Sequence, residues 1–275
     1  MKKEKVKVAI LDMNNQVPNK GLACIVEIVK NFQEEIDFKV FDVRAKKEIP
    51  DTSFDIYISS GGPGSPLEEG PWRKPYLDLI QQLWDFNLRS TEQKKYVFFI
   101  CYSFQVVCDY FDLGSVEPRK SMSFGILPMH KTKIGLSDPL FEGLSDPYYA
   151  MDSRSWQLIQ PDLKVFNEHG ASILSLEKIR THVEFERAIM AVRFSDEFVG
   201  TQFHPEAEPV GLKTYFSNPA NKQIVIRNFG EKKYNKMIKN IKDMSKIAKT
   251  YQTILPKFIS DAIHQVKYSG DAILK

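Results

Sequence analysis

The sequence predicts an α/β fold in which a doubly wound, mostly parallel sheet is followed by a C-terminal helical extension. Three observations lead to this prediction. Short apolar runs alternate with helical patterns through the first part of the chain, which is βαβ order. The run Tyr-Val-Phe-Phe-Ile at 96–100 is apolar at every position, as a central parallel strand covered on both faces requires. After about residue 210 only helical patterns remain.

The elements expected before residue 121 form the parallel part of the sheet. Apolar periodicity predicts strands at 6–13, 37–44, 54–60 and 96–100, and helices at 22–35 and 76–87. From Ser121 onward we expect strands with little helix between them, arranged as hairpins and sheet-edge additions, at 123–129, 148–154, 163–168, 188–194 and 198–203. Ligands of such a sheet bind at the carboxyl ends of its strands.

The helical end of the chain has its own charge character. The segment from Asn228 to Lys275 contains ten lysines and four acidic residues, a local charge of +6. Since the net charge of the chain is +3, the preceding part carries a charge of about −3. One face of a lysine-rich helix is marked by apolar residues, namely Met237, Ile241, Met244 and Ala248. We therefore expect two parts, residues 1–210 and a basic helical extension at 211–275 that packs on them.

Composition narrows the function classes. Aromatic residues are sparse among the C-terminal lysines and no nucleic-acid motif is present, so we expect no nucleic-acid partner. The first apolar stretch is too short for a signal peptide or a membrane span, so the expected location is cytoplasmic, without a membrane partner. Three cysteines without close spacing fit a reducing compartment and predict neither a disulfide framework nor a metal site.

Cys101 is the first candidate for chemistry. It follows the apolar strand at 96–100 directly and precedes a run with helical spacing, which places it in a strand-to-helix turn. A thiol at a helix N-terminus lies near free N–H groups and the positive end of the helix dipole, and both favour the nucleophilic thiolate. On this stretch alone, a small buried core residue is an equally good interpretation. Cys24 and Cys108 are expected to be core residues.

His204 and Glu206 form the second candidate. In an extended segment, side chains two residues apart point to the same side, so the imidazole and the carboxylate project together at the end of the strand at 198–203. A carboxylate beside a histidine fixes its tautomer and stabilises the imidazolium that forms when it accepts a proton. Taken alone, such a pair is usually a surface salt link.

A glycine-rich loop at 57–66, Tyr-Ile-Ser-Ser-Gly-Gly-Pro-Gly-Ser-Pro, is the third candidate. Such a loop after a strand can cradle phosphate with its N–H groups, or it can hold the oxyanion formed when a carbonyl is attacked. The phosphate interpretation resembles the pyrophosphatase loop of ATP-dependent synthetases, but Gly64 stands where that loop has Asp, and the loop follows a third strand. We favour the oxyanion loop.

The three motifs together resemble the class I, or triad, glutamine amidotransferases, particularly the amidotransferase domain of GMP synthetase. They occur in the order of that family, over roughly the first three quarters of the chain, as Ser-Gly-Gly-Pro-Gly-Ser-Pro at 60–66, Ile-Cys-Tyr-Ser-Phe-Gln at 100–105 and Thr-Gln-Phe-His-Pro-Glu at 201–206. The resemblance implies a flavodoxin-like amidotransferase fold and an enzyme that hydrolyses the amide of glutamine or a γ-glutamyl relative through a cysteine thioester.

The resemblance also implies a role for single residues. Cys101 would be the nucleophile, His204 the base and Glu206 its orienting partner. The main-chain N–H groups of Gly62 and Tyr102 would form the oxyanion hole, and Gln105 would contact the substrate. The resemblance implies no cofactor, and the ammonia would pass to a separate synthetase subunit.

The chain departs from the family pattern at the nucleophile and in the substrate loop. Phe99 and Ser103 replace two glycines around Cys101, and the ring of Phe99 is expected either to narrow the pocket or to fill core space. The histidine-containing substrate loop of the family is replaced by Met151–Gln157, in which Arg154 is either a carboxylate contact or a surface residue. These departures leave two other functions open, a catalytically weakened binding or regulatory protein and a different cysteine hydrolase or acyltransferase.

Overall fold

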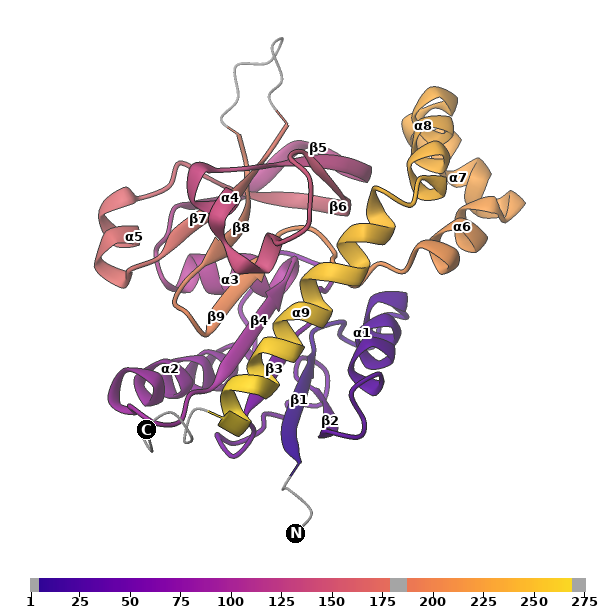
Figure 1. Ribbon diagram of the computed structural model, residues 1–275. Helices are drawn as coiled ribbons and strands as arrows, with labels where there is room; N and C mark the ends of the chain where they lie inside the picture. The colour runs from indigo at the N-terminus through magenta and orange to yellow at the C-terminus, as the bar shows by residue number, and fades with distance from the viewer. Residues whose placement is uncertain (1–4, 179–186, 269–275) are drawn as a thin grey trace.

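The computed structural model describes residues 5–178 and 187–268, and it confirms the predicted α/β fold class (Figure 1). In the part of the chain that it describes, nine strands form one sheet in the order β2-β1-β3-β4-β9-β8-β7-β5-β6. The first five of these are parallel to one another. Their bounds are β1 Val6–Asp12, β2 Ile36–Asp42, β3 Ile56–Ser59, β4 Tyr96–Ile100 and β9 Phe198–Thr201.

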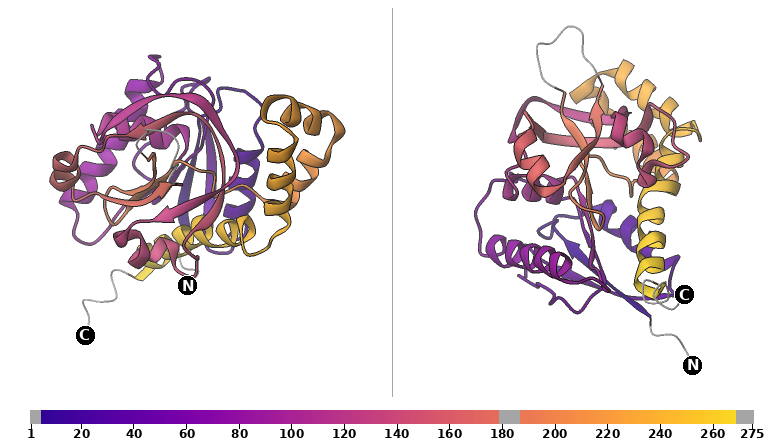
Figure 2. Two further views of the ribbon diagram at one scale, coloured as in Figure 1. Left: turned by 90° about the horizontal axis from the view of Figure 1, so that it is seen from above. Right: turned by 60° about the vertical axis from the view of Figure 1, so that its left-hand side comes forward.

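Helices cover both faces of the parallel strands, which makes the sheet doubly wound. On one face α1 (Lys20–Lys30) and α9 (Ile247–Tyr268) pack against apolar side chains of β1, β3 and β4. On the other face α2 (Arg73–Arg89) and α3 (Tyr102–Tyr110) build a second cluster. Figure 2 shows these helices on opposite sides of the strands. The carboxyl ends of β3, β4 and β9 therefore meet at one edge between two packed layers.

The remaining strands extend the sheet in antiparallel fashion, as expected for the segment after Ser121. They are β5 (Ser115–Lys131), β6 (Tyr148–Ile159), β7 (Ser172–Glu177) and β8 (Ile189–Arg193), with the short helix α4 (Lys133–Ser137) and a 3₁₀ turn (Pro139–Phe141) between β5 and β6. The long pair β5 and β6 curls over the end of the parallel sheet (Figure 2).

The strand predicted at 163–168 is wrong, because that segment forms helix α5 (Leu163–His169). The carboxylate of Asp162 accepts hydrogen bonds from the main-chain N–H groups of Lys164 and Val165, which caps the helix start. Gly170 ends it with a φ of 66°, a left-handed conformation that glycine adopts readily. Local capping thus decided between helix and strand for a short apolar run.

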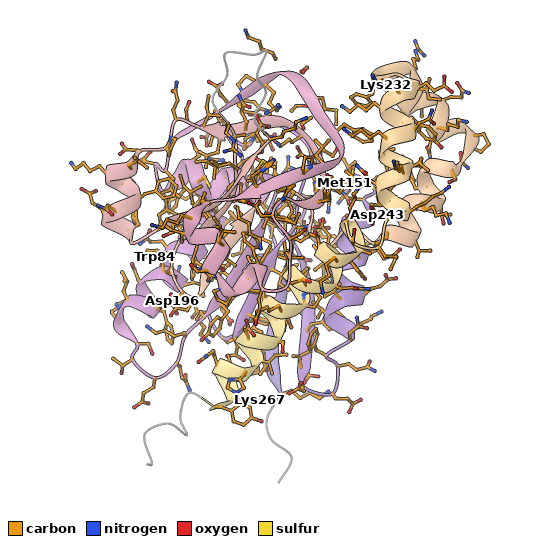
Figure 3. All side chains as sticks on the ribbon, turned by 45° about the horizontal axis from the view of Figure 1, so that its top comes forward. Trp84, Met151, Asp196, Lys232, Asp243 and Lys267 are labelled. Atoms are coloured by element: carbon orange, nitrogen blue, oxygen red, sulfur yellow. The ribbon has the colours of Figure 1, made fainter. Side chains whose placement is uncertain are left out.

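Within the described residues, four helices follow β9: α6 (Pro209–Ser217), α7 (Pro219–Phe229), α8 (Glu231–Lys242) and α9. The predicted single helix through Met237 and Ala248 is wrong, because α8 ends before Asp243. The carboxylate of Asp243 accepts a hydrogen bond from the N–H of Ser245 in a turn that leads into α9, and Met244 is exposed there. Helices α6 to α8 pack beside β5 and β6 and carry Lys232 outward, while Met151 lies where they meet the sheet (Figure 3). None of the described helices combines the length and the hydropathy that a membrane span requires.

Candidate active site

Cys101 lies in the turn that joins β4 to α3, as the sequence predicts. Its φ is 49°, a conformation that non-glycine residues rarely adopt, and its main-chain N–H donates to the carbonyl of Thr201 at 2.7 Å. The hydroxyl of Ser103 accepts from the N–H of Ile100 at 2.9 Å and donates to the carbonyl of Ser59 at 2.8 Å. Ser103 therefore fits the position where the family has glycine, and it ties the turn to the neighbouring strand.

His204 and Glu206 meet beside this turn. Nδ1 of His204 lies 2.8 Å from Oε1 of Glu206, and the N–H of His204 donates to the carbonyl of Met151 at 2.9 Å. Gly61 lies between the imidazole and the thiol, because a Cβ at Gly61 would be 2.9 Å from Cε1 of His204 and 3.6 Å from Cβ of Cys101. The imidazole thus interacts with both the buried carboxylate of Glu206 and the sulfur of Cys101, so the pair is not a surface salt link.

The pKa of His204 is held well above its usual range. Burial lowers this pKa, but the carboxylate of Glu206 and the hydrogen-bonded sulfur of Cys101 raise it by more. The imidazolium form is therefore favoured, which suits a partner that takes the proton of a thiol.

The N-terminal turn of helix α1 packs against the carboxylate of Glu206. The carboxylate is buried, and a Cβ at Gly21 would lie 2.9 Å from its Oε1 and 2.9 Å from Oδ1 of Asn19, the N-cap of α1. Only glycine gives this carboxylate room at the first turn, where the positive end of the helix dipole stabilises a negative charge. Sequence reasoning missed Gly21, since nothing local links it to residue 206.

The glycine-rich loop is fixed close to Cys101. A Cβ at Gly62 would overlap the main-chain oxygen of Met13, and the buried guanidinium of Arg44 donates to the carbonyls of Met13 and Pro63. Within the described residues, the main-chain N–H groups of Gly62 and Tyr102 have no hydrogen-bond acceptor. Both groups remain available to a ligand at the turn.

Two glutamines form a chain of contacts that leads from α3 to the sulfur of Cys101. Gln105 donates from Nε2 to Oε1 of Gln202 at 2.9 Å, and Nε2 of Gln202 lies 3.7 Å from Sγ of Cys101. Gln202 is fully buried and was not singled out in the sequence. Its place two residues before His204 is the signal that could have identified it, because alternate residues of a strand share a face.

The other two cysteines differ from Cys101. Burial raises the pKa of Cys108 well above its usual value, in agreement with a core residue. Cys24 is not a core residue as predicted: its side chain is half-buried and lines the cavity next to Glu206. Burial and the nearby carboxylates of Glu206 and Glu208 raise its pKa, so it stays a thiol. Across the described ranges, no group of three His, Cys, Asp or Glu side chains could hold a metal ion.

The sequence left two alternatives open for Phe99 and two for Arg154, and the structure rules out one of each. Phe99 is fully buried among the residues packed on α2 and α3, with its ring 5.7 Å from that of Phe194, so it fills core space and does not narrow the pocket. Arg154 is buried in β6 and not on the surface, and its segment is a strand and not a loop. Its guanidinium pairs with Asp152 at 3.0 Å and with Glu177 at 2.9 Å.

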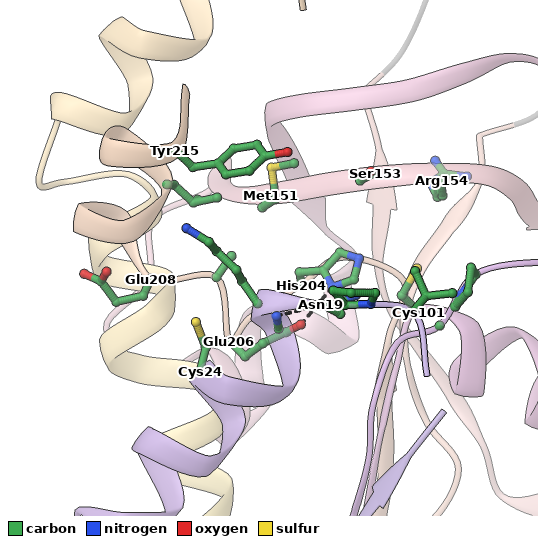
Figure 4. A pocket seen from close by; sticks show the side chains of 18 of the residues that line it. Asn19, Cys24, Cys101, Met151, Ser153, Arg154, His204, Glu206, Glu208 and Tyr215 are labelled. Atoms are coloured by element: carbon green, nitrogen blue, oxygen red, sulfur yellow. Dashed lines mark hydrogen bonds and ion pairs between the residues drawn. The ribbon is translucent and has the colours of Figure 1, made fainter. Parts of the chain in front are cut away.

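The side chains around Cys101 and His204 line one cavity of about 540 Å³ (Figure 4). Cys101, Gln105, His204 and Glu206 line it together with residues of the glycine-rich loop. Helix α1, strand β6 and helix α6 supply most of the remaining wall. Of the predicted site residues, the cavity lining includes Gly62, Cys101, Gln105, Arg154, His204 and Glu206.

Comparison with known proteins finds glutamine amidotransferases both among family models and among solved structures. The family model described as glutamine amidotransferase class-I matches residues 20–219. A glutamine amidotransferase from Thermotoga maritima superposes with a TM-score of 0.67 at 15% identity, covering 94% of this chain and 99% of that one. A glutamine amido transferase from Methylobacillus flagellatus gives a TM-score of 0.60 at 13% identity over 96% and 94%.

A third structure is the glutaminase domain of Trypanosoma brucei CTPS with bound acivicin. Its TM-score is 0.53 at 12% identity, and the match covers 74% of this chain and 86% of that one. At these identities the likeness concerns the fold alone. No curated protein matches the sequence.

Proposed function

The chain belongs to the class I glutamine amidotransferase family, and from this membership we propose that it hydrolyses the side-chain amide of glutamine through a thioester on Cys101 and releases ammonia. The observation that carries the proposal is the convergence of the Cys101 thiol with the hydrogen-bonded pair of His204 and Glu206 at one cavity. Two segments far apart in the sequence supply these groups: Cys101 follows β4, and His204 and Glu206 follow β9.

The proposed reaction has two halves. The sulfur of Cys101 bonds to the amide carbon after its proton passes to His204, and His204 then protonates the departing nitrogen as the carbon–nitrogen bond breaks. Water attacks the thioester with His204 as base, which frees glutamate and restores the thiol. The N–H groups of Gly62 and Tyr102 stabilise the oxyanion of both halves, and Glu206 stabilises the imidazolium.

Gln105 and Arg154 are the proposed contacts of the glutamine backbone. Both line the cavity, and Gln105 reaches the nucleophile through Gln202. Because Asp152 and Glu177 neutralise the charge of Arg154, we expect Arg154 to contribute a hydrogen bond more than a net positive charge.

Two further features belong to this proposal. A separate synthetase subunit is the expected acceptor of the ammonia, and the protein is expected to work in the cytoplasm without a cofactor. The alternative of a weakened, purely binding protein is less well supported, because the core position of Phe99 and the fit of Ser103 remove the sequence-based reason for it. A γ-glutamyl substrate other than glutamine remains the second candidate and is taken up in the next subsection.

Ammonia release from glutamine tests the proposal. We expect wild-type protein and the Cys108→Ala variant to release ammonia, and Cys101→Ala to release none above the uncatalysed rate. Cys108 is the matched control because it is a buried cysteine of the same helix that does not line the cavity. Equal release by wild type and Cys101→Ala would reject the proposal.

A further inference from the structure

The cavity is larger than free glutamine requires. Its volume of about 540 Å³ lies within the range of about 300–1,000 Å³ that holds drug-sized ligands, and glutamine is much smaller than those. The groups proposed for amide chemistry occupy only one end of it. The other end extends past His204 toward helix α6, as Figure 4 shows for Tyr215 and Met151.

We call this other end the leaving-group lobe and define it by five lining residues. They come from α1, β6 and α6, and they are Lys20, Met151, Leu212, Tyr215 and Phe216. Met151 and Phe216 are buried in one apolar cluster, against which Leu212 packs. The rings of Tyr215 and Phe216 stand edge to face, 5.1 Å apart. The lobe is therefore an apolar, aromatic wall with a single ammonium group.

The position of His204 decides which part of a substrate would enter this lobe. The imidazole must protonate the departing nitrogen, so that nitrogen lies beside it when the bond breaks. In Figure 4, His204 lies between Cys101 and Tyr215. Any group attached to the departing nitrogen would consequently extend past His204 into the lobe, while the glutamyl part stays near Gln105.

Lys20 adds a charge requirement. The exposed ammonium of Lys20 lies 5.0 Å from the ring centroid of Tyr215, and it forms no ion pair with a carboxylate of the described residues. The nearby carboxylate of Glu208 accepts hydrogen bonds from the N–H groups of Val210 and Gly211 at the start of α6. The ammonium is thus free to meet an anionic group of a ligand.

From these observations we propose that the site hydrolyses γ-glutamyl amides of amino acids with a large apolar side chain. This inference rests on the proposed function and names its substrate class. The apolar side chain lies against Met151, Tyr215 and Phe216, and its carboxylate pairs with Lys20. Helix α6, the first helix after β9, thereby becomes part of the site.

The reaction balances with water as the only co-reactant. The sulfur–carbon bond forms and the carbon–nitrogen bond of the γ-amide breaks, while the amino group of the released amino acid takes its proton from His204. Water then adds to the thioester carbon, the sulfur–carbon bond breaks, and glutamate leaves. The products are glutamate and one free amino acid.

The first test compares substrates on wild-type protein. We expect kcat/KM for γ-glutamyl-phenylalanine to exceed that for glutamine by about tenfold or more, since burying an apolar group in a matching pocket gives discrimination of that order. If glutamine is hydrolysed and γ-glutamyl-phenylalanine is hydrolysed no better, the inference is overturned and the proposed function stands. If neither substrate is hydrolysed, both are overturned.

The second test uses variants of the lobe. Tyr215→Ala should lower the ratio of kcat/KM for γ-glutamyl-phenylalanine to that for glutamine by about tenfold, and Tyr215→Phe should restore it because the ring remains. Ile224→Ala is the matched control, since Ile224 is a partly exposed apolar residue of α7 outside the cavity lining. An unchanged ratio in Tyr215→Ala would overturn the assignment of the lobe.

The third test isolates the carboxylate. γ-Glutamyl-phenethylamide has the same ring and no carboxylate. Lys20→Met should lower kcat/KM for γ-glutamyl-phenylalanine about tenfold more than kcat/KM for this amide. Lys20→Arg should restore the wild-type ratio of the two values, because the positive charge remains. Lys30→Met, at the exposed other end of α1, is the control. Equal effects on both substrates would overturn the role of Lys20.

Discussion

Gly200 of β9 lies directly beside Phe99 of β4, so close that a Cβ at Gly200 would be 3.2 Å from the Cβ of Phe99. The same Cβ would be 2.8 Å from the ring of Phe104 on α3. The absence of a side chain at Gly200 therefore makes room for two aromatic residues in the layer next to the turn that holds Cys101.

This packing makes Phe99 a stability residue. Phe99→Ala should lower the free energy of unfolding by about 3–5 kcal/mol, since it removes a fully buried ring, and it should not raise the turnover of glutamine. Urea unfolding and ammonia release, measured on the same samples, check both statements. Leu88→Ala, on the exposed face of α2, is the control with little expected change. A gain in turnover would contradict the core position of the ring.

Gly21 is expected to affect catalysis through Glu206. Gly21→Ala places a methyl group 2.9 Å from the carboxylate of Glu206, so the carboxylate must move away from His204. We expect kcat to fall about tenfold or more while the melting temperature changes little, because alanine favours the helix. If the Gly21→Ala protein folds and keeps the wild-type kcat, the added methyl group does not displace the carboxylate of Glu206, and the prediction is wrong.

Gln202 is expected to stabilise the thiolate of Cys101. Gln202→Met keeps the length of the side chain and removes the N–H that faces the sulfur. Hydrogen bonds to charged groups contribute about 1.5–3 kcal/mol, so the rate of Cys101 alkylation should fall about tenfold or more. Alkylation kinetics at neutral pH measure this rate. A rate equal to that of wild type would argue against a role of Gln202 at the sulfur.

The raised pKa of His204 predicts the sign of a pH effect on stability. Since the folded pKa lies above the unfolded value of about 6.5, the imidazolium stabilises the fold fully below that value, and this contribution is lost as the pH rises through the folded pKa. The excess stability of wild type over His204→Asn should therefore decrease as the pH rises above about 6.5. Urea unfolding at several pH values measures it, and an excess that grows with pH would have the wrong sign.

Much of this fold could be predicted because its parallel strands are buried on both faces. The run at 96–100 shows that burial as unbroken apolar sequence, and the turn after it places Cys101. The strand predicted at 163–168 failed because Asp162 and Gly170 cap a helix whose apolar pattern is too short to identify by period.

Local spacing in the sequence predicts only those contacts at the site that join residues close in sequence. His204 and Glu206 are two positions apart, so their shared direction follows from strand geometry. Gly21 and Tyr215 act on the same cavity from helices that tertiary packing brings there, and no local pattern reveals such an approach. Phe99 was ambiguous in sequence because its direction depends on which face of β4 meets α3.

The most direct measurement of the central claim identifies which cysteine a glutamine-derived diazo-ketone modifies. Cys101 and Cys24 line the same cavity, and Cys108 lies fully buried on α3, so all three are informative. Mass spectrometry of the digested protein, labelled while folded at neutral pH, should find the adduct on Cys101 alone, and His204→Asn should slow its formation. An adduct on Cys24 or Cys108 with Cys101 unmodified would contradict the account.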